Sequence, residues 1–299
     1  MMSLIVCGFT KNSESYIYKH LQLLYNMAPL FNTFKMLIYE NDSEDNTVKI
    51  LEKFKQTHPK FDYISENIQN QLSRTEVLSR TEVLAHGRNT LLKYIQGFDY
   101  MIMVDLDDVI ATFKPSQLKY LFEHKEWDAL FANSETYYDV SALRIEKDKW
   151  TPKCPFKVID YDCWEKAHYH NSKHFVSQHQ IKIPSSAPLI PVNSAFGGFG
   201  IYKVNKINGR YDGSKECEHV SFHKGMNNLF ICPKFMVNKQ DHHLIKKNRN
   251  QNENRNQTII SHILYTLMVI YKDSKESIYK YFIYLVSYIK RIQNIKIKD

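Results

Sequence analysis

The residues best suited to chemistry in this sequence are two aspartates, Asp105 and Asp107, which follow the apolar run Tyr100–Val104. Alternate side chains of a β-strand share a face, so the two carboxylates would point the same way. Hard oxygen ligands of this kind attract Mg²⁺ or Mn²⁺, which keep coordination positions open for phosphate oxygens. The spacing therefore predicts a divalent-metal site for a diphosphate; the alternative is a solvated turn that caps the next helix.

A second group of reactive side chains lies in Glu216–His223. At helical spacing His219 and His223 share one face. Carboxylate and histidine side chains can act as general bases, and Glu218 and His219 are the candidates in this segment. The alternative is an exposed helix without a chemical role. A zinc site is not expected, because no third strong ligand has suitable spacing.

Two further segments hold candidate ligand contacts. Asp162 and Trp164 lie in the aromatic-rich stretch 139–192, where they could contact a ligand, although a core position is the alternative for the tryptophan. Gly197 and Gly198 belong to a glycine-rich run in a glycine-poor chain. They indicate either close approach of the backbone to a ligand or a tight turn between strands.

The elements that must position these residues alternate between strand and helix over the first 135 residues. We expect strands at 4–9, 34–39, 61–64, 99–104 and 129–131, with helices that begin near Ser13, at Asp42 or Ser43, and near residue 114. A long helix ends near 94–95, before Gly97. This alternation predicts a doubly wound, Rossmann-like α/β fold with a mostly parallel central sheet flanked by helices. Its ligands would bind at the carboxyl ends of the strands, where Asp105 lies.

A six-residue repeat precedes the end of the long helix, as Leu72–Val77 and Leu78–Val83. Each copy contains the capping-box pattern Ser-x-x-Glu, at Ser73 and at Ser79. Six residues turn a helix by about 600°, so the two copies cannot share a face. We therefore expect one copy to precede the helix proper.

The chain changes character near residue 240. Residues 246–257 are polar and rich in asparagine, and 259–270 and 278–292 have helical periodicity. We divide the chain into an α/β catalytic domain, residues 1–240, and a linker with a C-terminal helical appendage, residues 241–299. The appendage either packs on the main domain or on a second subunit as a dimer contact, or lies on a membrane surface through its aromatic and basic residues.

Composition limits the class of protein. The 299 residues are 43% hydrophobic and 24% charged, enough for a sizeable core. The net charge of +8 is spread along the chain without a basic-aromatic patch, so no nucleic-acid partner is expected. The 5 cysteines form no Cys-x-x-Cys pair and indicate free thiols. Without a visible signal peptide or spanning segment, we expect a cytoplasmic protein, with membrane association through the appendage as a variant.

Three motifs together resemble the GT-A glycosyltransferases: Tyr39–Thr47, Leu84–Leu92 and the acidic strand end Asp105–Asp108. Their order is similar to that of cryptococcal-type α-1,3-mannosyltransferases and related capsule-type enzymes, whose acceptor-side Pro-Val…Gly motif corresponds to Pro191–Gly198. The resemblance covers Ser3–Asn238. This chain departs from the pattern at Asp105–Asp108, where relatives show Asn-Asp, so the resemblance implies metal dependence more strongly than it implies mannose.

The resemblance implies a GT-A fold, a UDP- or GDP-linked sugar donor, Mn²⁺ or Mg²⁺ as cofactor, and a glycan or glycoprotein acceptor. The residues that it implies, together with those predicted above, fall into four groups. The donor-binding residues are Thr10, Glu40, Asn41, Asp42, Arg88, Asn89, Asp105 and Leu106. The acceptor-binding residues are Asp162, Trp164, Gly197 and Gly198, and the metal ligands are Asp105, Asp107 and His242. The catalytic residues are Glu218 and His219. The resemblance implies Glu218 as the base that activates the acceptor hydroxyl, with His219 as the second candidate.

Several of these assignments have alternatives. Arg88 could pair with an aspartate of the acidic cluster, bind the donor phosphates or be a plain surface residue. Glu40–Asp42 could hydrogen-bond the base or ribose, or form part of an Asx-type cap at Asp45. His242 could instead be an exposed residue of a polar linker.

The predicted function is that of a metal-dependent glycosyltransferase of the hexosyltransferase class. A nucleotidyltransferase would also hold Mg²⁺ with paired aspartates, but Cys7–Lys11 is too poor in glycine to form its phosphate loop. A non-catalytic carbohydrate-binding module is the third possibility, and it would leave the acidic strand end without a purpose.

Overall fold

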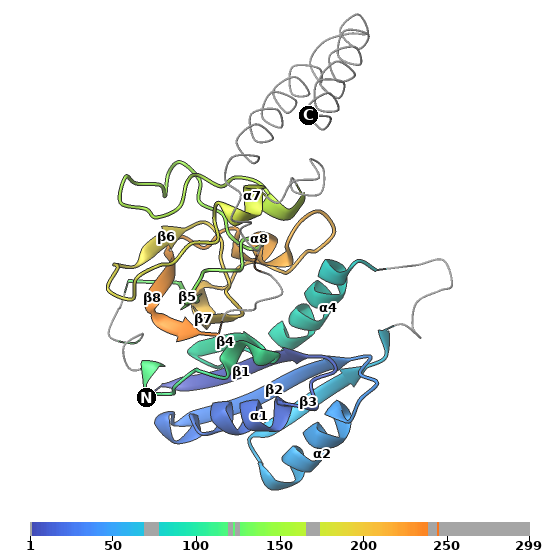
Figure 1. The fold of residues 1–299 in the computed structure, drawn as a ribbon. Helices are drawn as coiled ribbons and strands as arrows, with labels where there is room; N and C mark the ends of the chain where they lie inside the picture. Colours follow the sequence, from blue (N-terminus) through green and yellow to red (C-terminus); the bar gives the residue numbers. More distant parts are fainter. Residues whose placement is uncertain are drawn as a thin grey trace, which may run out of the picture. The chain divides into compact units, whose positions relative to one another are not determined.

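The computed structural model describes residues 2–68, 78–118, 122, 126–165, 174–238 and 244 (Figure 1). Its elements, in chain order, are β1 (Ser3–Thr10), α1 (Ile17–Tyr25), η1 (Ala28–Leu30), β2 (Thr33–Asn41), α2 (Thr47–Thr57), β3 (Phe61–Glu66), α4 (Arg80–Leu92), β4 (Tyr100–Asp105), η2 (Asp108–Ile110), β5 (Ala129–Ser134), α7 (His174–Ser177), β6 (Ile190–Val192), β7 (Phe199–Lys203), η3 (Val204–Lys206), α8 (Glu218–His223) and β8 (Leu229–Val237).

These strands form one sheet in the order β3-β2-β1-β4-β7-β5-β8-β6. β1 pairs in parallel with both β2 and β4, and β2 pairs in parallel with β3. β7 inserts antiparallel between β4 and β5, β8 is parallel to β5, and β6 is antiparallel to β8. The predicted mostly parallel, Rossmann-like sheet is confirmed, and the carboxyl ends of β1, β2 and β4 share one edge.

Helices cover both faces of the parallel half of the sheet, as Figure 1 shows. The alternation of β1 divides its side chains between two cores. Leu4 and Val6 join a cluster that includes residues of α1 and α2, whereas Ile5, Cys7 and Phe9 join a cluster that includes residues of α4. A strand buried on both faces must be apolar throughout, which explains the uninterrupted apolar runs of β1 and β4.

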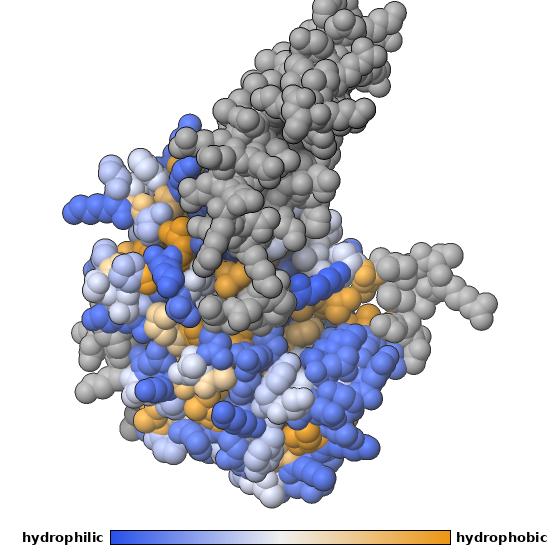
Figure 2. Space-filling model, viewed as in Figure 1, coloured by the Kyte–Doolittle hydropathy of each residue, from blue (hydrophilic) through white to orange (hydrophobic). Residues whose placement is uncertain are grey.

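The two helices on the first face are amphipathic. Ile17, Leu21 and Leu24 are buried in α1, and Thr47, Leu51 and Phe54 are buried in α2, each set at the i, i+4, i+7 spacing of one helical face. Figure 2 shows a largely hydrophilic surface in the part of this view around α2 and β3. The opposite, polar sides of these helices therefore face solvent.

Helix ends differ from the predictions by a few residues. α1 begins at Ile17, because the Ser13 carbonyl first accepts hydrogen bonds from the amides of residues 16 and 17 in a separate turn. The helix that was expected to end near 94–95 ends at Leu92, and Gly97, with φ of +89°, lies in the turn that leads to β4.

The second copy of the hexapeptide repeat begins α4. Ser79 is the N-cap residue, its hydroxyl accepts from the amide of Glu82, and the Glu82 carboxylate accepts from the Ser79 amide at 2.8 Å. This is the predicted capping box. The first copy, Leu72–Val77, lies outside the described residues, so the expectation that it precedes the helix proper remains a prediction.

Two compact units divide the chain, Met1–Ile245 and Lys246–Asp299. The second unit, with the predicted helical appendage, lies outside the described residues, and the predicted domain boundary at residues 240/241 stays a prediction. Within the described part of the chain, no helix is both long enough and apolar enough to cross a membrane.

Candidate active site

The acidic strand end lies at the carboxyl edge of the parallel strands, as predicted. Asp105 is the last residue of β4 and is paired in register with Phe9 of β1. Its amide donates to the carbonyl of Gly198 at 2.9 Å, and the Leu106 amide donates to the carbonyl of Phe9 at 2.9 Å. The backbone of the Asp-x-Asp motif is therefore fixed on both sides, by β1 and by the turn that precedes β7.

The three aspartates of this motif have different surroundings. Asp105 has a side chain that is 31% exposed and accepts a hydrogen bond from Arg88. Asp107 is half-buried, and its carboxylate accepts from the amide of Val109 at 3.2 Å as the N-cap of η2. Asp108 is exposed. The turn-capping alternative is thus realised at Asp107.

Leu106 contributes to this site only through its backbone. Its side chain is fully buried in the core cluster of α1 and α2, so that a Cβ added at Gly8 would lie 2.7 Å from the Leu106 Cδ1. The predicted donor contact through Leu106 therefore has no side chain directed to the strand edge.

Arg88 forms the centre of the site. Its side chain is 2% exposed; Nη2 donates to Asp105 Oδ1 at 2.7 Å, and Nη1 donates to Oε1 of Glu218. Burial alone would lower the pKa of Arg88, but the adjacent charge of Asp105 raises it above its usual value. The prediction of a pair with the acidic cluster is the one that the structure shows, and the surface alternative is wrong.

Close packing of α4 brings Arg88 to this position. A Cβ on Gly87 would lie 2.5 Å from the rings of Phe9 and Tyr39, so the helix can approach β1 and β2 only because residue 87 is glycine. The neighbouring residue, Asn89, donates to the carbonyl of Tyr211 at 2.8 Å and accepts from the amide of Tyr211 at 3.0 Å. The Asn89 amide, which was predicted to bind the donor, forms hydrogen bonds with the backbone of the segment before α8.

Helix α8 is buried, contrary to the alternative of an exposed helix. Glu218 is 3% exposed, and among the described residues neither ring nitrogen of His219 has a hydrogen-bond partner. The His219 ring stacks on Phe196 with centroids 3.8 Å apart. Burial, with repulsion from Arg88 and His223, lowers the pKa of His219 well below its usual range. His219 is therefore neutral near pH 7.

His223 shares the buried face of α8 with His219, as the helical spacing predicted, and their rings are 5.8 Å apart. Ser194 Oγ lies 2.9 Å from its Nδ1 and the Tyr202 hydroxyl 3.1 Å from its Nε2. Burial lowers the pKa of His223 to about 3. Its two nitrogens are engaged in the core, so it contributes to stability rather than to ligand binding.

The predicted donor-side residues of β1 and β2 lie at the same edge. Thr10 is buried and its hydroxyl lies 2.5 Å from that of Ser13. Glu40 is buried and accepts from the Ser43 amide at 2.8 Å. Asn41 donates to Asp42 at 2.7 Å, while its buried Oδ1 has no hydrogen-bond partner among the described residues. An acceptor left in this state costs free energy unless a ligand or water pairs with it.

The chain reverses at Asp42, whose φ is +50°. The turn continues to Asp45, whose carboxylate accepts from the Thr47 amide at 2.9 Å. The predicted Asx-type cap at Asp45 is therefore present, while the helix start predicted at Asp42 or Ser43 is wrong by several residues. The physical reason is that the carboxylate of Asp45, and not that of Asp42, reaches the first free amide of α2.

The predicted acceptor-side residues have local structural contacts. Asp162 accepts from the amides of Trp164 and Glu165 and so caps the turn that begins after it. Trp164 is partly buried and packs against the core cluster of α4, which agrees with the core alternative.

Gly197 and Gly198 form the predicted tight turn, with φ of +67° and +77°. A Cβ on Gly197 would lie 2.6 Å from the Ala132 carbonyl. The turn therefore requires glycine for its conformation and for the space it occupies.

One carboxylate near the site, that of Asp139, was not predicted from the sequence. Asp139 follows β5, is half-buried, and accepts from the Gly197 amide at 2.8 Å. Burial and the nearby charge of Asp105 raise the pKa of Asp139, although the Gly197 amide opposes the rise. The available signal was an aspartate in the loop that follows a predicted strand, 129–131.

The carboxylates suit one kind of metal site. Among the described residues, no group of three or more His, Cys, Asp or Glu side chains could hold an ion. Asp105 and Asp107 are hard oxygen donors at an accessible edge, and Mg²⁺-type ions commonly take one or two carboxylates, with phosphates and water completing the shell. The chemistry of these two donors suits such an ion, and two carboxylates do not make a closed protein cage. His242, the third predicted ligand, lies outside the described residues.

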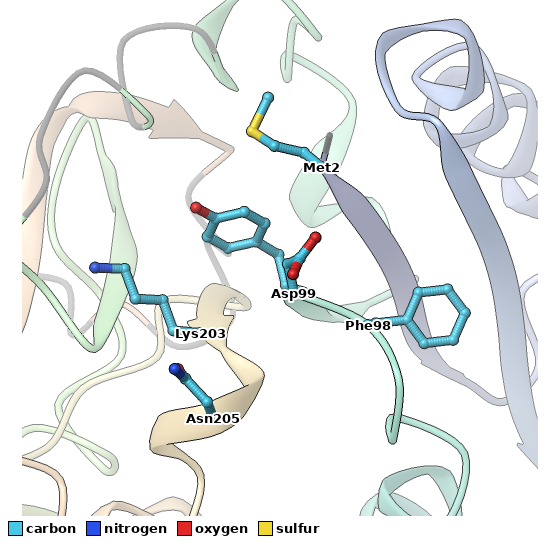
Figure 3. Close-up of a pocket in the computed structure, with 6 residues that line it drawn as sticks. Met2, Phe98, Asp99, Lys203 and Asn205 are labelled. Carbon is cyan, nitrogen blue, oxygen red and sulfur yellow. The ribbon is translucent and has the colours of Figure 1, made fainter.

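A cavity of about 370 Å³ lies at the opposite end of β1 and β4 (Figure 3). Met2, which precedes β1, and Tyr100, which begins β4, are among its lining residues, together with Asp99 and Lys203. Asp105 ends β4, so this cavity is separated from the acidic edge by the length of the strand. It is not part of the candidate active site.

Comparison with known proteins gives a family match. Glycosyl transferase family 2 matches residues 3–179, which include β1 to β5 with Arg88, Asp105 and Asp107. No curated protein matches the chain.

Several solved structures are similar in fold. TarS 1-349 of S. aureus is 16% identical with a TM-score of 0.42, and the match covers 79% of this chain and 59% of that one. The mannosyltransferase PcManGT from Pyrobaculum calidifontis, in complex with GDP-Man and Mn²⁺, is 13% identical with a TM-score of 0.46, covering 91% and 65%. HddC from Yersinia pseudotuberculosis is 13% identical with a TM-score of 0.41, covering 79% and 90%. This chain therefore spans less than two thirds of the TarS and PcManGT chains.

Proposed function

Because the chain belongs to glycosyl transferase family 2, we propose that it moves a sugar from a nucleotide-diphosphate-sugar donor to a hydroxyl of a glycan or protein acceptor. The observation that carries this proposal is the accessible carboxylate pair of Asp105 and Asp107, which lies at the carboxyl edge of β4 within the family match. Ligands of open α/β sheets bind at this edge. The proposed nucleotide is UDP or GDP, and the proposed resemblance to cryptococcal-type α-1,3-mannosyltransferases rests on the order of the motifs and does not extend to mannose as the sugar.

We place the donor diphosphate at Asp105 and Asp107. Mn²⁺ or Mg²⁺ held there would neutralise the charge that develops on the departing nucleoside diphosphate. Backbone hydrogen bonds to the carbonyls of Gly198 and Phe9, together with the ion pair with Arg88, hold Asp105 at this edge. Pre-arranged charges of this kind need no reorganisation when the glycosidic bond to phosphate breaks.

The nucleoside is placed at the ends of β1 and β2. The buried Oδ1 of Asn41 is an acceptor without a partner among the described residues, and the carboxylate of Asp42 is adjacent to it. Both can accept hydrogen bonds from base N–H groups or ribose hydroxyls. Thr10 contacts the Ser13 hydroxyl, and Glu40 accepts from the Ser43 amide. These contacts hold the backbone that follows β1 and β2.

The acceptor hydroxyl must lose a proton when it attacks the sugar. Glu218 is the proposed base and His219 the second candidate, because both lie beside Arg88 and the acidic edge. Asp139 is a rival for Glu218, since it is half-buried rather than enclosed and its pKa is raised, and a base works best with a pKa near the operating pH.

A thermal-shift screen tests the function. UDP- and GDP-linked sugars are added to the wild-type protein with and without Mn²⁺, and a ligand at about 100 times its Kd should stabilise the fold by about 2.7 kcal/mol. We expect one nucleotide class to stabilise the protein only when Mn²⁺ is present. Asp107→Ala should abolish that shift, whereas the neighbouring Asp108→Ala, at an exposed position, should keep it.

Two outcomes would contradict the proposal. If no nucleotide-sugar shifts the wild-type protein, the donor assignment is wrong. If Asp107→Ala retains the full Mn²⁺-dependent shift, the donor assignment stands but the metal lies elsewhere.

A further inference from the structure

Arg88 joins two elements that are far apart in the sequence. From α4, its Nη2 reaches Asp105 on β4 and its Nη1 reaches Glu218 on α8, 17 and 130 residues away. Three aromatic rings surround the guanidinium carbon at 5.2–5.9 Å from their centroids: Phe9, Phe196 and Tyr211. The side chain is thus enclosed by two carboxylates and three ring faces, which attract a cation.

Helix α4, which carries Arg88, also makes hydrogen bonds with the segment that precedes α8. Asn89 makes two hydrogen bonds with the backbone of Tyr211, and the Thr81 hydroxyl donates to the carbonyl of Gly213 at 2.7 Å. These contacts hold α4 against the segment that leads into α8. The backbone that carries Arg88 is therefore held next to the segment that carries Glu218.

This geometry does not suit direct contact with a donor phosphate. The Arg88 side chain is 2% exposed, whereas the Asp105 side chain in front of it is 31% exposed. Both terminal nitrogens already donate to carboxylates, and the remaining Nε is buried without a partner among the described residues. A ligand at the strand edge would meet Asp105 first.

We propose that Arg88 is a positioning residue that holds Asp105 and Glu218 in one fixed arrangement and does not contact the donor. The inference rests on the proposed function, in which Asp105 would hold the metal-bound diphosphate and Glu218, enclosed beside Arg88, is the proposed base. A guanidinium can bridge two carboxylates with its planar fork, whereas a lysine offers one point charge. Arg88 would therefore set the separation between the donor side and the acceptor side of the reaction.

The test compares Arg88→Lys with Arg144→Lys. Arg144 is a matched control, because it is also buried and pairs with one carboxylate, that of Glu216 at 2.8 Å, and with two backbone carbonyls. Mn²⁺ affinity is measured by electron paramagnetic resonance of the free ion in the presence of UDP, or of GDP if the wild-type protein binds only GDP. The Kd values of the diphosphate and of the corresponding monophosphate are then measured at saturating Mn²⁺.

Loss of a residue that orients a metal ligand typically costs about 10- to 100-fold in metal affinity or activity. Arg88→Lys should therefore weaken Mn²⁺ binding by that factor while the preference for diphosphate over monophosphate at saturating Mn²⁺ stays at the wild-type value. At saturating Mn²⁺, kcat for donor hydrolysis should fall and the donor KM should not, because Glu218 has also lost its partner. Arg144→Lys should change none of these quantities.

The opposite pattern would overturn the inference. A loss of the diphosphate preference at saturating Mn²⁺ would show direct phosphate contact by Arg88, and unchanged Mn²⁺ affinity would show that Arg88 does not position Asp105. Absence of any Mn²⁺-dependent nucleotide binding by the wild-type protein would instead overturn the proposed function itself.

A second variant covers the case in which Arg88→Lys does not fold, as judged by near-ultraviolet circular dichroism. The double variant Arg88→Met/Glu218→Met replaces the enclosed pair by apolar side chains, a change that often preserves stability. It leaves the partly exposed Asp105 without its cation, so the same loss of Mn²⁺ affinity is expected. Wild-type Mn²⁺ affinity in the folded double variant would also overturn the inference.

Discussion

Arg88 and its two carboxylates show how single residues share roles in this site. An arginine on an amphipathic helix is usually exposed, because isolated charge is costly to bury. Here the cost is offset by Asp105 and Glu218, and loss of one member of such a pair leaves the other uncompensated, at a cost of about 3–5 kcal/mol. The charged residues of the site are therefore interdependent.

The two candidate bases can be separated at the same scale. Glu218→Gln should lower the rate of donor hydrolysis by about 10²- to 10⁴-fold, the usual contribution of a general base, and should leave donor binding unchanged. Asp139→Asn is the matched change, because the amide oxygen can still accept from the Gly197 amide. We expect it to retain activity, measured as release of nucleoside diphosphate.

The reverse result would reassign the base. Full activity of the Glu218→Gln protein combined with inactivity of the Asp139→Asn protein would place proton transfer at Asp139. Loss of activity in both, with normal nucleotide binding, would indicate that the two carboxylates act together.

At the level of elements, the start of α4 matters because this helix carries Arg88 and Asn89. Both sides of the capping box at Ser79 and Glu82 are formed, and the sequence offers a second, identical hexapeptide as a control. Ser79→Ala should lower the free energy of unfolding by about 1 kcal/mol, the usual effect of removing an N-cap. Urea denaturation measures the change.

Ser73→Ala makes the same substitution in the first copy of the repeat. Because a helix has one N-terminus, we expect this change to stay within about 0.5 kcal/mol of the wild-type protein. A loss equal to that of Ser79→Ala would show that both copies cap helices, and would contradict the expectation that one copy precedes the helix proper.

Strand ends illustrate a second feature of the elements. Asp105 ends β4, Asp42 directly follows β2, and Asp139 lies in the loop that follows β5; these three strands run in one direction. Ligands of open α/β sheets bind at the carboxyl ends of the strands, so a polar side chain at such a position can contact a ligand. The turn of Gly197 and Gly198 connects this edge to β7 and contacts two of these aspartates.

At the level of the whole molecule, the buried histidines of α8 link stability to pH. The folded protein holds His219 and His223 neutral, with the pKa of His223 near 3 and that of His219 also lowered, whereas an unfolded histidine has a pKa of about 6.5. Below about pH 6.5 the unfolded state binds more protons than the folded state. Stability is therefore fully present above that pH and is lost as the pH falls.

Between pH 7.0 and pH 5.5 the expected loss from His223 is about 1.2 kcal/mol, and His219 adds to the loss in the same direction. Urea denaturation at pH 7.0 and pH 5.5 measures it, at pH values above those at which most carboxylates titrate. His223→Gln removes one titrating group and keeps an amide for Ser194 or Tyr202, so its stability should depend less steeply on pH. An equally steep dependence in this variant would contradict the assignment.

The sequence by itself determined the parts that depend on local periodicity. Apolar runs with turn signals located β1 to β5, alternation placed Asp105 at a strand end, and the Ser-x-x-Glu pattern located the cap of α4, because each depends on residues within a few positions of one another. The face shared by His219 and His223 was predictable for the same reason.

Only the tertiary structure decided which of these residues meet. The contact of Arg88 with Glu218, the use of Asn89 to hold Tyr211, the burial of Leu106 and the approach of Asp139 to the Gly197 turn join positions that are 58 to 130 residues apart or depend on the packing of a whole face. Helical or strand periodicity gives the direction of a side chain but not the element opposite it. That choice depends on how α4 and α8 pack on the completed sheet.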